Sequence, residues 1–351
     1  MAHTAALAPA DSDNSNQRTI LGDTTQRIDV VDVGGFAYAH ATNAPGGTGA
    51  TVFIFDHASP AGVAIRGGGP ASRETPLLAP TAAAQGINAL LLSGGSAYGL
   101  DAAGGVMRFL EEEGVGVHVV SDCVPLVCQS SLFDLPVGDS RARPTAQDLY
   151  VASQQAAAVS FVNGNVGAGT GCSVGKYHGM GQAMKTGIGS YAVQLGGIRI
   201  GAVVAVNALG DIYEAGTNTV IAGMRSPSGA GFESTFDDFV KDAAAGRPLP
   251  QGNTTLGAVF TNAKFNKTEL TTIAQMAHNG YARAIRPVHT SADGDSIYAI
   301  STGTVPADPD ILGTLAAYVI ENAIEVAAHS AQSAYGLPSA NDLDDSFPAA
   351  T

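Results

Sequence analysis

The chain has 351 residues, of which 45% are hydrophobic, 14% are charged and 44 are glycine, and its net charge is −14. A chain of this length and apolar content can bury a large core in one or two domains. Abundant glycine and sparse charge favour close-packed strands and backbone-lined pockets over long solvated helices. The negative charge argues against a nucleic acid or an anionic membrane as a partner, because neither would be attracted to it. These properties leave room for an enzyme and exclude most other classes.

The two ends of the chain are predicted to lack stable structure. Residues 1–23 are expected to form a disordered leader, because their start is rich in Ala, Asp and Asn and lacks the features of a targeting signal. Residues 339–351 are acidic and rich in Pro and Ala, which indicates a flexible tail. Gly or polar residues interrupt the apolar stretches before the ~20 residues that a membrane span needs. We therefore expect a cytoplasmic protein with no membrane partner.

Short β-like runs are distributed along the middle of the chain. Apolar and β-branched residues predict strands at 51–55, 115–120, 198–206 and 296–302. The three cysteines, Cys123, Cys128 and Cys172, form neither an even disulfide framework nor a CxxC metal pair, and we expect them to be small buried side chains.

Three helices are predicted from helical spacing and end signals. Ser96–Glu113 is followed by Gly114 as a stop signal, and Asn266–Ile285 opens with an Asn-x-x-Glu capping box. Ile311–His329 is apolar on nearly all sides, so it should be deeply buried or lie at a subunit interface. Strands and helices in mixed order indicate a layered α/β protein, in which 233–252 is the one long connection.

The four residues Gly252-Asn253-Thr254-Thr255 stand directly before a strand-like run at 256–261. A threonine at this place can attack the preceding Asn253 carbonyl, and hydrolysis of the resulting ester frees Thr254 as a new N-terminus. That residue then owns a hydroxyl nucleophile and an α-amine, with a reference pKa of about 7.7–8.0, that can act as its base. From the local sequence alone, such residues before a strand usually form an ordinary turn.

Other motifs also have two interpretations. The glycine-rich loop at 164–171 resembles a phosphate-binding loop, but the later Gly175-Lys176 is followed by Tyr177 in place of Ser or Thr. A tight turn or a backbone-lined pocket wall fits it better. Asp293-Gly294-Asp295 could be a hairpin turn. The eight histidines show no zinc-type spacing, so we expect no metal.

Together these motifs resemble the L-aminopeptidase/D-esterase family of N-terminal-nucleophile hydrolases, which includes β-peptidyl aminopeptidases and 6-aminohexanoate-oligomer (nylon-oligomer) hydrolases. The resemblance extends from about residue 24 to about residue 327. Its motifs are the "GGSAxGLDAA" segment at 92–103, Arg66-Gly67-Gly68-Gly69-Pro70, the loop at 164–171, Asn253-Thr254-Thr255, the run 282–290 and Asp293-Gly294-Asp295.

The resemblance implies a precursor that cuts itself into a large and a small chain. Residues 24–253 would form the α chain and 254–338 the β chain, together in one catalytic domain. The implied fold is a four-layer α-β-β-α sandwich, and the implied assembly is a symmetric homotetramer of αβ units. No cofactor is expected.

The resemblance also implies roles for five residues. Thr254 would be the nucleophile, and the side-chain amide of Asn207 would donate to the developing oxyanion. Lys176 would lie beside the nucleophile, where a cation lowers the pKa of the Thr254 amine. Asp293 and Asp295 would orient Thr254. Lys176 as a surface lysine and Asn207 as a strand-end turn residue remain the alternatives.

One departure from the family bears on the substrate. Aminopeptidase members carry a Glu two residues before a Tyr, to hold the free ammonium group of the substrate, but this chain has Ser131 and Phe133 there. A buried ammonium needs a counter-charge, which only Asp134 could supply. Phe133 could accept methylene chains. Gly167 and Gly169 are predicted to line the same pocket.

The predicted function is therefore hydrolysis of linear amide oligomers, such as 6-aminohexanoate oligomers, through an acyl-enzyme on Thr254. An N-terminal aminopeptidase, D-amino-acid esterase or β-peptidyl aminopeptidase is the first alternative. A non-catalytic, assembly-forming member of the family is the second.

Overall fold

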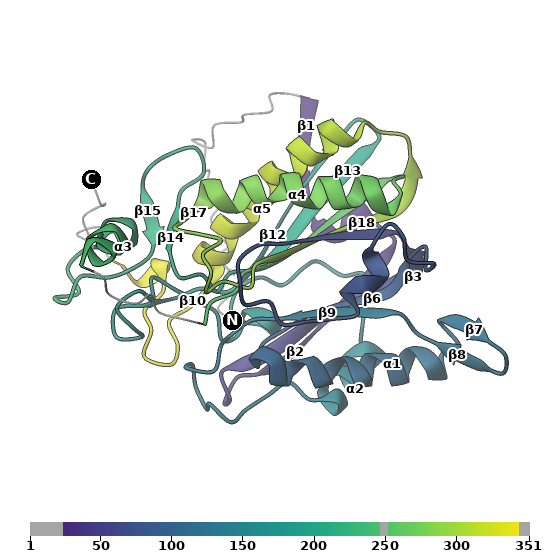
Figure 1. Ribbon diagram of the computed structural model, residues 1–351, viewed down its shortest axis with the longest axis horizontal. Coiled ribbons are helices and arrows are strands. Elements are labelled where there is room, and N and C mark those ends of the chain that lie inside the picture. Colours follow the sequence, from purple (N-terminus) through teal and green to yellow (C-terminus); the bar gives the residue numbers. More distant parts are fainter. Residues whose placement is uncertain (1–23, 246–251, 344–351) are drawn as a thin grey trace, which may run out of the picture.

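The computed structural model describes residues 24–245 and 252–343, and its elements form four layers, with two sheets between outer helices (Figure 1). The six strands of one sheet are, in order, β1 (Thr25–Ile28), β12 (Ile188–Leu195), β13 (Ile198–Ala205), β16 (Leu256–Ala263), β18 (Ser296–Val305) and β4 (Ala61–Ile65). The five strands of the other are β2 (Phe36–Asn43), β3 (Thr48–Ser59), β6 (Ile87–Ser93), β9 (Val127–Ser131) and β5 (Ser72–Arg73).

Four helices cover the outer faces of these sheets. α4 (Lys267–Ala284) and α5 (Pro309–Ser330) pack on the six-stranded sheet, and α1 (Ala103–Glu112) and α2 (Ala146–Gln154) cover the five-stranded sheet (Figure 1). Each helix–sheet interface buries its own apolar cluster, and a third cluster fills the space between the sheets. Since each sheet must bury both faces, this layering satisfies the apolar pattern of the chain. The predicted α-β-β-α sandwich is confirmed.

Smaller elements extend the two ends of the sandwich. At one end, α3 (Thr235–Ala244) lies beside a small sheet of β15 (Val220–Ala222), β14 (Asp211–Tyr213) and β17 (Ile285–Arg286) (Figure 1). At the other end, β7 (Val117–Val119) and β8 (Asp122–Val124) form a hairpin. β10 (Ser173–Val174) pairs with β11 (Met184–Lys185). The predicted strand at 115–120 is thus only the three-residue, solvent-exposed β7.

The predicted helices agree with the structure except at one start. Asn266 caps α4 with the expected capping box, in which Glu269 bonds back to the Asn266 N–H. The helix predicted from Ser96 begins instead as the 3₁₀ helix Ser96–Ala102, and α1 starts at Ala103. The tighter turn places Gly99 against the Gly94 carbonyl, where a Cβ has no room.

The segment predicted as one long connection, 233–252, contains α3. Ser234 caps this helix by accepting from the Asp237 N–H at 3.2 Å. The prediction missed this helix, which spans only ten residues. Residues 246–251 lie outside the described residues.

Helix α5 is buried inside the subunit, between α4 and strands β12 and β13. By length and composition alone it could cross a membrane, contrary to the expectation from interrupted apolar stretches, but most of it is covered by the fold. Of the predicted tail, Ala340–Asp342 form a 3₁₀ helix, and the Asn341 amide donates to the His329 carbonyl at the end of α5. Residues 344–351 and the leader 1–23 are not described.

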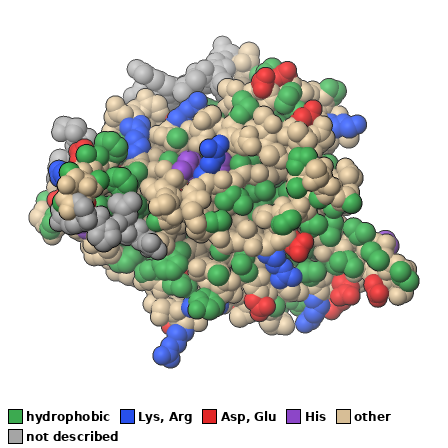
Figure 2. Space-filling model, viewed as in Figure 1, with side chains coloured by type: hydrophobic (Ala, Val, Ile, Leu, Met, Phe, Trp, Pro, Cys, Tyr) green, Lys and Arg blue, Asp and Glu red, His purple; other side chains and the backbone are tan. Residues whose placement is uncertain are grey.

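The charged side chains on the face shown in Figure 2 are scattered among hydrophobic and uncharged ones. This distribution shows no extended basic surface on that face.

Candidate active site

Three neighbouring strands bring the predicted catalytic segments to one end of the six-stranded sheet. β16 runs parallel to β18, with Leu256 opposite Ser296, so the residues that precede these two strands lie side by side. β13 runs antiparallel to β16, with Ala205 opposite Leu256. The residues that follow β13 therefore reach the same place. Strand pairing thus brings together segments that are roughly 40 to 90 residues apart in sequence.

Thr254 is buried, with 3% of its surface exposed, at the centre of this cluster. Its hydroxyl donates to the Asn253 carbonyl oxygen at 2.5 Å, and its N–H donates to the Asn207 carbonyl at 3.1 Å. The Asn253 carbonyl oxygen also accepts from the Gly294 N–H at 3.1 Å. The hydroxyl is therefore next to the carbonyl that it is predicted to attack, and a backbone donor is aimed at the oxygen that would become negative.

Two glycines allow close packing around the Asn253–Thr254 peptide bond. Gly252 has φ of +95°, a conformation that L side chains rarely adopt, and it packs against the ring of Phe133. A Cβ on Gly294 would lie 2.9 Å from the Thr254 hydroxyl oxygen. The N–H of Gly294 can approach the Asn253 carbonyl because this side chain is absent.

Lys176 and Asn207 form a second buried group beside Thr254. The Lys176 ammonium donates to Oδ1 of Asn207 at 2.8 Å and to the Asn207 carbonyl at 3.1 Å. Burial lowers the pKa of Lys176 to about 8, while the charges of Asp293 and Asp295 act in the opposite direction. An amine with this pKa can change its charge near neutral pH.

The side chain of Asn207 is held in one orientation by its partners. Oδ1 accepts from the Ser173 N–H at 3.2 Å and from Lys176, and Nδ2 donates to the Phe133 carbonyl at 2.8 Å. Nδ2 carries a second hydrogen, for which no acceptor is found among the described residues. That N–H is the group that could serve as an oxyanion donor.

Asp295 and Asp293 accept hydrogen bonds from different backbone N–H groups. Asp295 accepts the Thr255 N–H at Oδ1, 2.8 Å away, and so fixes the backbone next to the predicted nucleophile, Thr254. Asp293 accepts the Thr290 N–H through its carboxylate and closes the turn between them. Burial, followed by the nearby charge of Asp295, raises the pKa of Asp293 to about 6. The segment is therefore not the simple hairpin turn of the alternative interpretation.

Two groups in this cluster were not predicted. His289 lies 2.8 Å from Oδ2 of Asp295, and Gly294 supplies the N–H described above. His289 belongs to the run 282–290 that carries the family resemblance, which was the only signal in the sequence.

A cavity of about 220 Å³ opens at Thr254. Its lining includes Ser131 and Phe133, as predicted, and the glycine loop after Arg66 contributes Gly68 and Gly69. None of the described lining residues carries a charged side chain.

Three residues predicted for the pocket lie elsewhere. Asp134 is buried and accepts from the Thr48 hydroxyl at 2.6 Å and the Gly95 N–H at 2.7 Å, so it ties loops together behind the pocket. Gly167 packs against His40 and Thr51, and Gly169 packs against the backbone near Ile188. The glycine-rich loop at 164–171 therefore allows close packing between the sheets, and its Gly167 and Gly169 do not line the cavity.

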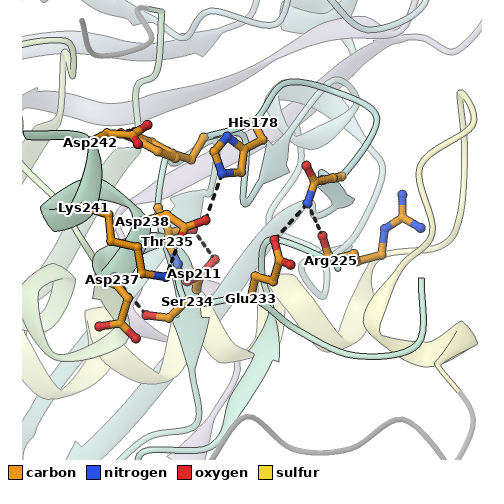
Figure 3. A network of polar contacts seen from close by, with 12 residues as sticks. His178, Asp211, Arg225, Glu233, Ser234, Thr235, Asp237, Asp238, Lys241 and Asp242 are labelled. Atoms are coloured by element: carbon orange, nitrogen blue, oxygen red, sulfur yellow. Dashed lines mark hydrogen bonds and ion pairs between the residues drawn. The ribbon is translucent and has the colours of Figure 1, made fainter. Parts of the chain in front are cut away.

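The loop that follows Lys176 is anchored on α3 by the polar network in Figure 3. The Tyr177 hydroxyl donates to Asp242 at 3.0 Å, and His178 lies 2.9 Å from Asp238. Asp211 of β14 accepts from the N–H and hydroxyl of Thr235 at the start of α3, at 2.9 and 2.7 Å. The helix that precedes the Asn253–Thr254 bond thus holds the lysine loop in place.

Within 24–245 and 252–343, no group of three or more His, Cys, Asp or Glu side chains could hold a metal ion. The groups at this end of the sheet are a hydroxyl, an amide, a lysine, an imidazole, two carboxyl groups and backbone N–H groups.

A family model described as peptidase family S58 matches residues 29–338. An uncharacterized aminopeptidase of Mycobacterium leprae (strain TN) is 38% identical over 319 residues, which cover 83% of this chain and 84% of that protein. A 6-aminohexanoate-oligomer endohydrolase of Kocuria sp. (strain KY2) is 29% identical over 69% of this chain and 71% of its own length. The solved L-aminopeptidase D-Ala-esterase/amidase of Ochrobactrum anthropi, described as a variant of the Ntn hydrolase fold, aligns with a TM-score of 0.64 and 18% identity over 86% of each chain.

The fold and these matches define an amide-bond hydrolase with the N-terminal-nucleophile fold. The chain belongs to peptidase family S58, as the sequence motifs predicted.

Proposed function

We propose that the chain cuts itself between Asn253 and Thr254 and then uses Thr254 to hydrolyse internal amide bonds of linear oligomers such as 6-aminohexanoate oligomers. The observation that carries this proposal is the contact of 2.5 Å between the Thr254 hydroxyl and the Asn253 carbonyl oxygen, which the Gly294 N–H also contacts. Nucleophile, electrophile and a donor for the oxyanion are therefore assembled before the bond is cut.

Self-cleavage proceeds through an ester. Oγ1 of Thr254 attacks the carbonyl carbon of Asn253 and loses its proton, and the C–N bond breaks as the nitrogen takes up a proton. Water then hydrolyses the ester, which leaves a carboxylate on Asn253 and a free amine on Thr254. The Gly294 N–H and the positive end of Lys176 stabilise negative charge during the first step.

Turnover uses the same hydroxyl on a substrate amide. The free amine of Thr254 accepts the hydroxyl proton while Oγ1 attacks the substrate carbonyl, and that proton passes to the leaving amine. The second N–H of Asn207 Nδ2, which has no acceptor among the described residues, would donate to the oxyanion. Water then releases the acyl group and restores the hydroxyl.

The uncharged pocket supports internal cleavage over removal of a free N-terminal residue. The substrate ammonium that an aminopeptidase must bind would find no carboxylate among the described lining residues. Asp134 does not provide one, because Thr48 and Gly95 already bind its two oxygens. The Kocuria relative, a 6-aminohexanoate-oligomer endohydrolase, is consistent with this choice.

An aminopeptidase or D-amino-acid esterase is the second candidate, because the relatives from M. leprae and O. anthropi carry aminopeptidase names. A substrate panel separates the two. We expect N-acetylated and free trimers of 6-aminohexanoate to be cleaved at similar rates, and amino-acid p-nitroanilides to be poor substrates. Cleavage that requires a free amine would establish the aminopeptidase. A chain that stays uncut and cleaves none of these compounds would favour the non-catalytic alternative.

A further inference from the structure

A string of hydrogen bonds leads from the nucleophile segment into the space beneath α4. The Thr255 N–H donates to Oδ1 of Asp295 at 2.8 Å, and Oδ2 of Asp295 lies 2.8 Å from Nδ1 of His289. Nε2 of His289 lies 3.2 Å from Nδ1 of His278, and Nε2 of His278 lies 3.0 Å from the Ala64 carbonyl oxygen. We call these three side chains the Asp295–His289–His278 string. Neither histidine lines the cavity.

The hydrogens along the Asp295–His289–His278 string can be assigned by starting at the Ala64 carbonyl, where the acceptor is known. A backbone carbonyl can only accept, so Nε2 of His278 carries a hydrogen. If His278 is neutral, its Nδ1 is then a bare acceptor, and Nε2 of His289 must donate to it. The remaining nitrogen of His289, Nδ1, faces a carboxyl oxygen of Asp295. A contact of 2.8 Å between them requires one further hydrogen, which belongs either to His289 or to Asp295.

His278 meets the condition that it is neutral. It is 4% exposed, on the inner side of α4, and burial lowers its pKa to about 4. The cation of Arg66, after β4, acts in the same direction. Tyr281, one turn further along α4, packs against both histidine rings. Burial keeps its phenol neutral by raising its pKa well above the usual value.

We propose that His278 and His289 are positioning residues that hold one extra proton against Asp295, so that the Asp295–His289 pair is electrically neutral. In the usual aspartate–histidine arrangement the outer nitrogen is free and the pair carries one negative charge. Here Nδ1 of His278 accepts a hydrogen bond from the outer nitrogen of His289, Nε2. This acceptor keeps the hydrogen on Nε2.

The extra proton reduces the negative charge near Thr254. Asp295 can hold the Thr255 N–H without adding a full negative charge next to Asp293, a residue that is itself only 2% exposed. The other charges that face the string are those of Arg66 and, beyond the two carboxyl groups, Lys176. The effect on turnover rests on the proposed function, whereas the placement of the proton does not.

The proton itself is tested by NMR of the full chain labelled with ¹⁵N-histidine, in the wild type and in Thr254→Ala, which is expected to stay uncut. Between pH 7 and 8, roughly, we expect Nε2 of both histidines to carry hydrogen and Nδ1 of His278 to be bare. A far-downfield proton signal should report the hydrogen between His289 and Asp295, and His289→Asn assigns it by removing it. A bare Nε2 on His289 would overturn the proposal. Because Thr254→Ala needs no activity, this result is independent of the proposed function.

A matched pair of substitutions tests the consequence. In His278→Gln, the amide oxygen can accept from His289 and the amide nitrogen can donate to the Ala64 carbonyl, so the proton is kept. In His278→Leu, His289 loses its acceptor and gives up the proton, which leaves one more negative charge near Thr254.

That charge raises the pKa of the Thr254 amine and of Asp293. The ascending limb of the pH–kcat profile should therefore move to higher pH in His278→Leu, by roughly one unit for a charge within ~10 Å at an effective dielectric constant of ~20. His278→Gln should keep the wild-type limb. Equal loss of kcat in both variants without a shift would reduce the histidines to packing residues and contradict the proposal. If His278→Leu does not fold, the NMR result decides.

Discussion

Asn207 is predicted to have two separable roles, as a structural centre of the site and as an oxyanion donor. Asn207→Ala removes the Oδ1 acceptor of Lys176 and Ser173 and the Nδ2 donor of the Phe133 carbonyl. Lys176 and Ser173 are buried and Phe133 is partly buried, and a buried polar group without a partner costs about 1–3 kcal/mol. Lys176 keeps the Asn207 carbonyl, so we expect a total loss of roughly 3–5 kcal/mol, out of about 5–15 kcal/mol for a typical domain.

Asn207→Asp separates the two roles. Its Oδ1 still accepts from Lys176 and Ser173, but an oxygen replaces Nδ2 and removes the donor. Guanidinium unfolding should show a smaller loss of stability than for Asn207→Ala, while kcat should fall about 10²–10³-fold in both variants, as for the loss of one oxyanion donor. Full turnover in Asn207→Asp, or unchanged stability in Asn207→Ala, would refute this reasoning.

Three further predictions concern charge and assembly. Lys176→Met removes the buried cation that disfavours a protonated Thr254 amine. The pKa of that amine should therefore rise, and the ascending limb of the pH–kcat profile should move to higher pH. An unchanged profile would show that Lys176 does not act on the amine. Asp295→Asn should slow both self-cleavage and turnover, followed on gels and by initial rates, because both steps use the Thr254 hydroxyl, which Asp295 helps to position through the Thr255 N–H. Light scattering should show a tetramer of αβ units, and a single species of 35.3 kDa over a wide concentration range would contradict this.

The motif resemblance predicted the layers, and it named residues that the fold brings together at one end of the six-stranded sheet. Strands β13, β16 and β18 have continuous apolar patterns, and the motif resemblance placed Asn207, Thr254 and Asp295 at their ends. The pairing of these strands, which the sequence did not predict, brings the residues together. The buried α5 followed from its apolar circumference, although this burial inside the subunit removes the helix as evidence for an oligomer interface.

What could not be predicted depends on contacts across the fold. A glycine in a loop is compatible with a pocket wall or with close packing, and only the positions of His40 and Thr51 show that Gly167 has the second role. Asp134 was a candidate ammonium anchor until the structure placed Thr48 and Gly95 at its two oxygens.

The histidines were missed because their pairing has no periodic signature. His278 lies in the middle of α4 and His289 in an irregular segment 11 residues later. His289 contacts Asp295, and His278 reaches His289 only through the packing of α4 on the sheet. Spacing rules for metal sites could not detect such a pair.

Intact-mass analysis of the purified protein tests the central claim most directly, with two neighbouring threonines as a matched pair. Thr254 and Thr255 are both buried, but the Thr255 hydroxyl has no hydrogen-bond partner among the described residues. The wild type and Thr255→Val should each yield two chains, residues 1–253 and 254–351, and Thr254→Val should yield one uncut chain. A cut at any other bond, or a cut that persists in Thr254→Val, would contradict the assignment of Thr254 as the nucleophile.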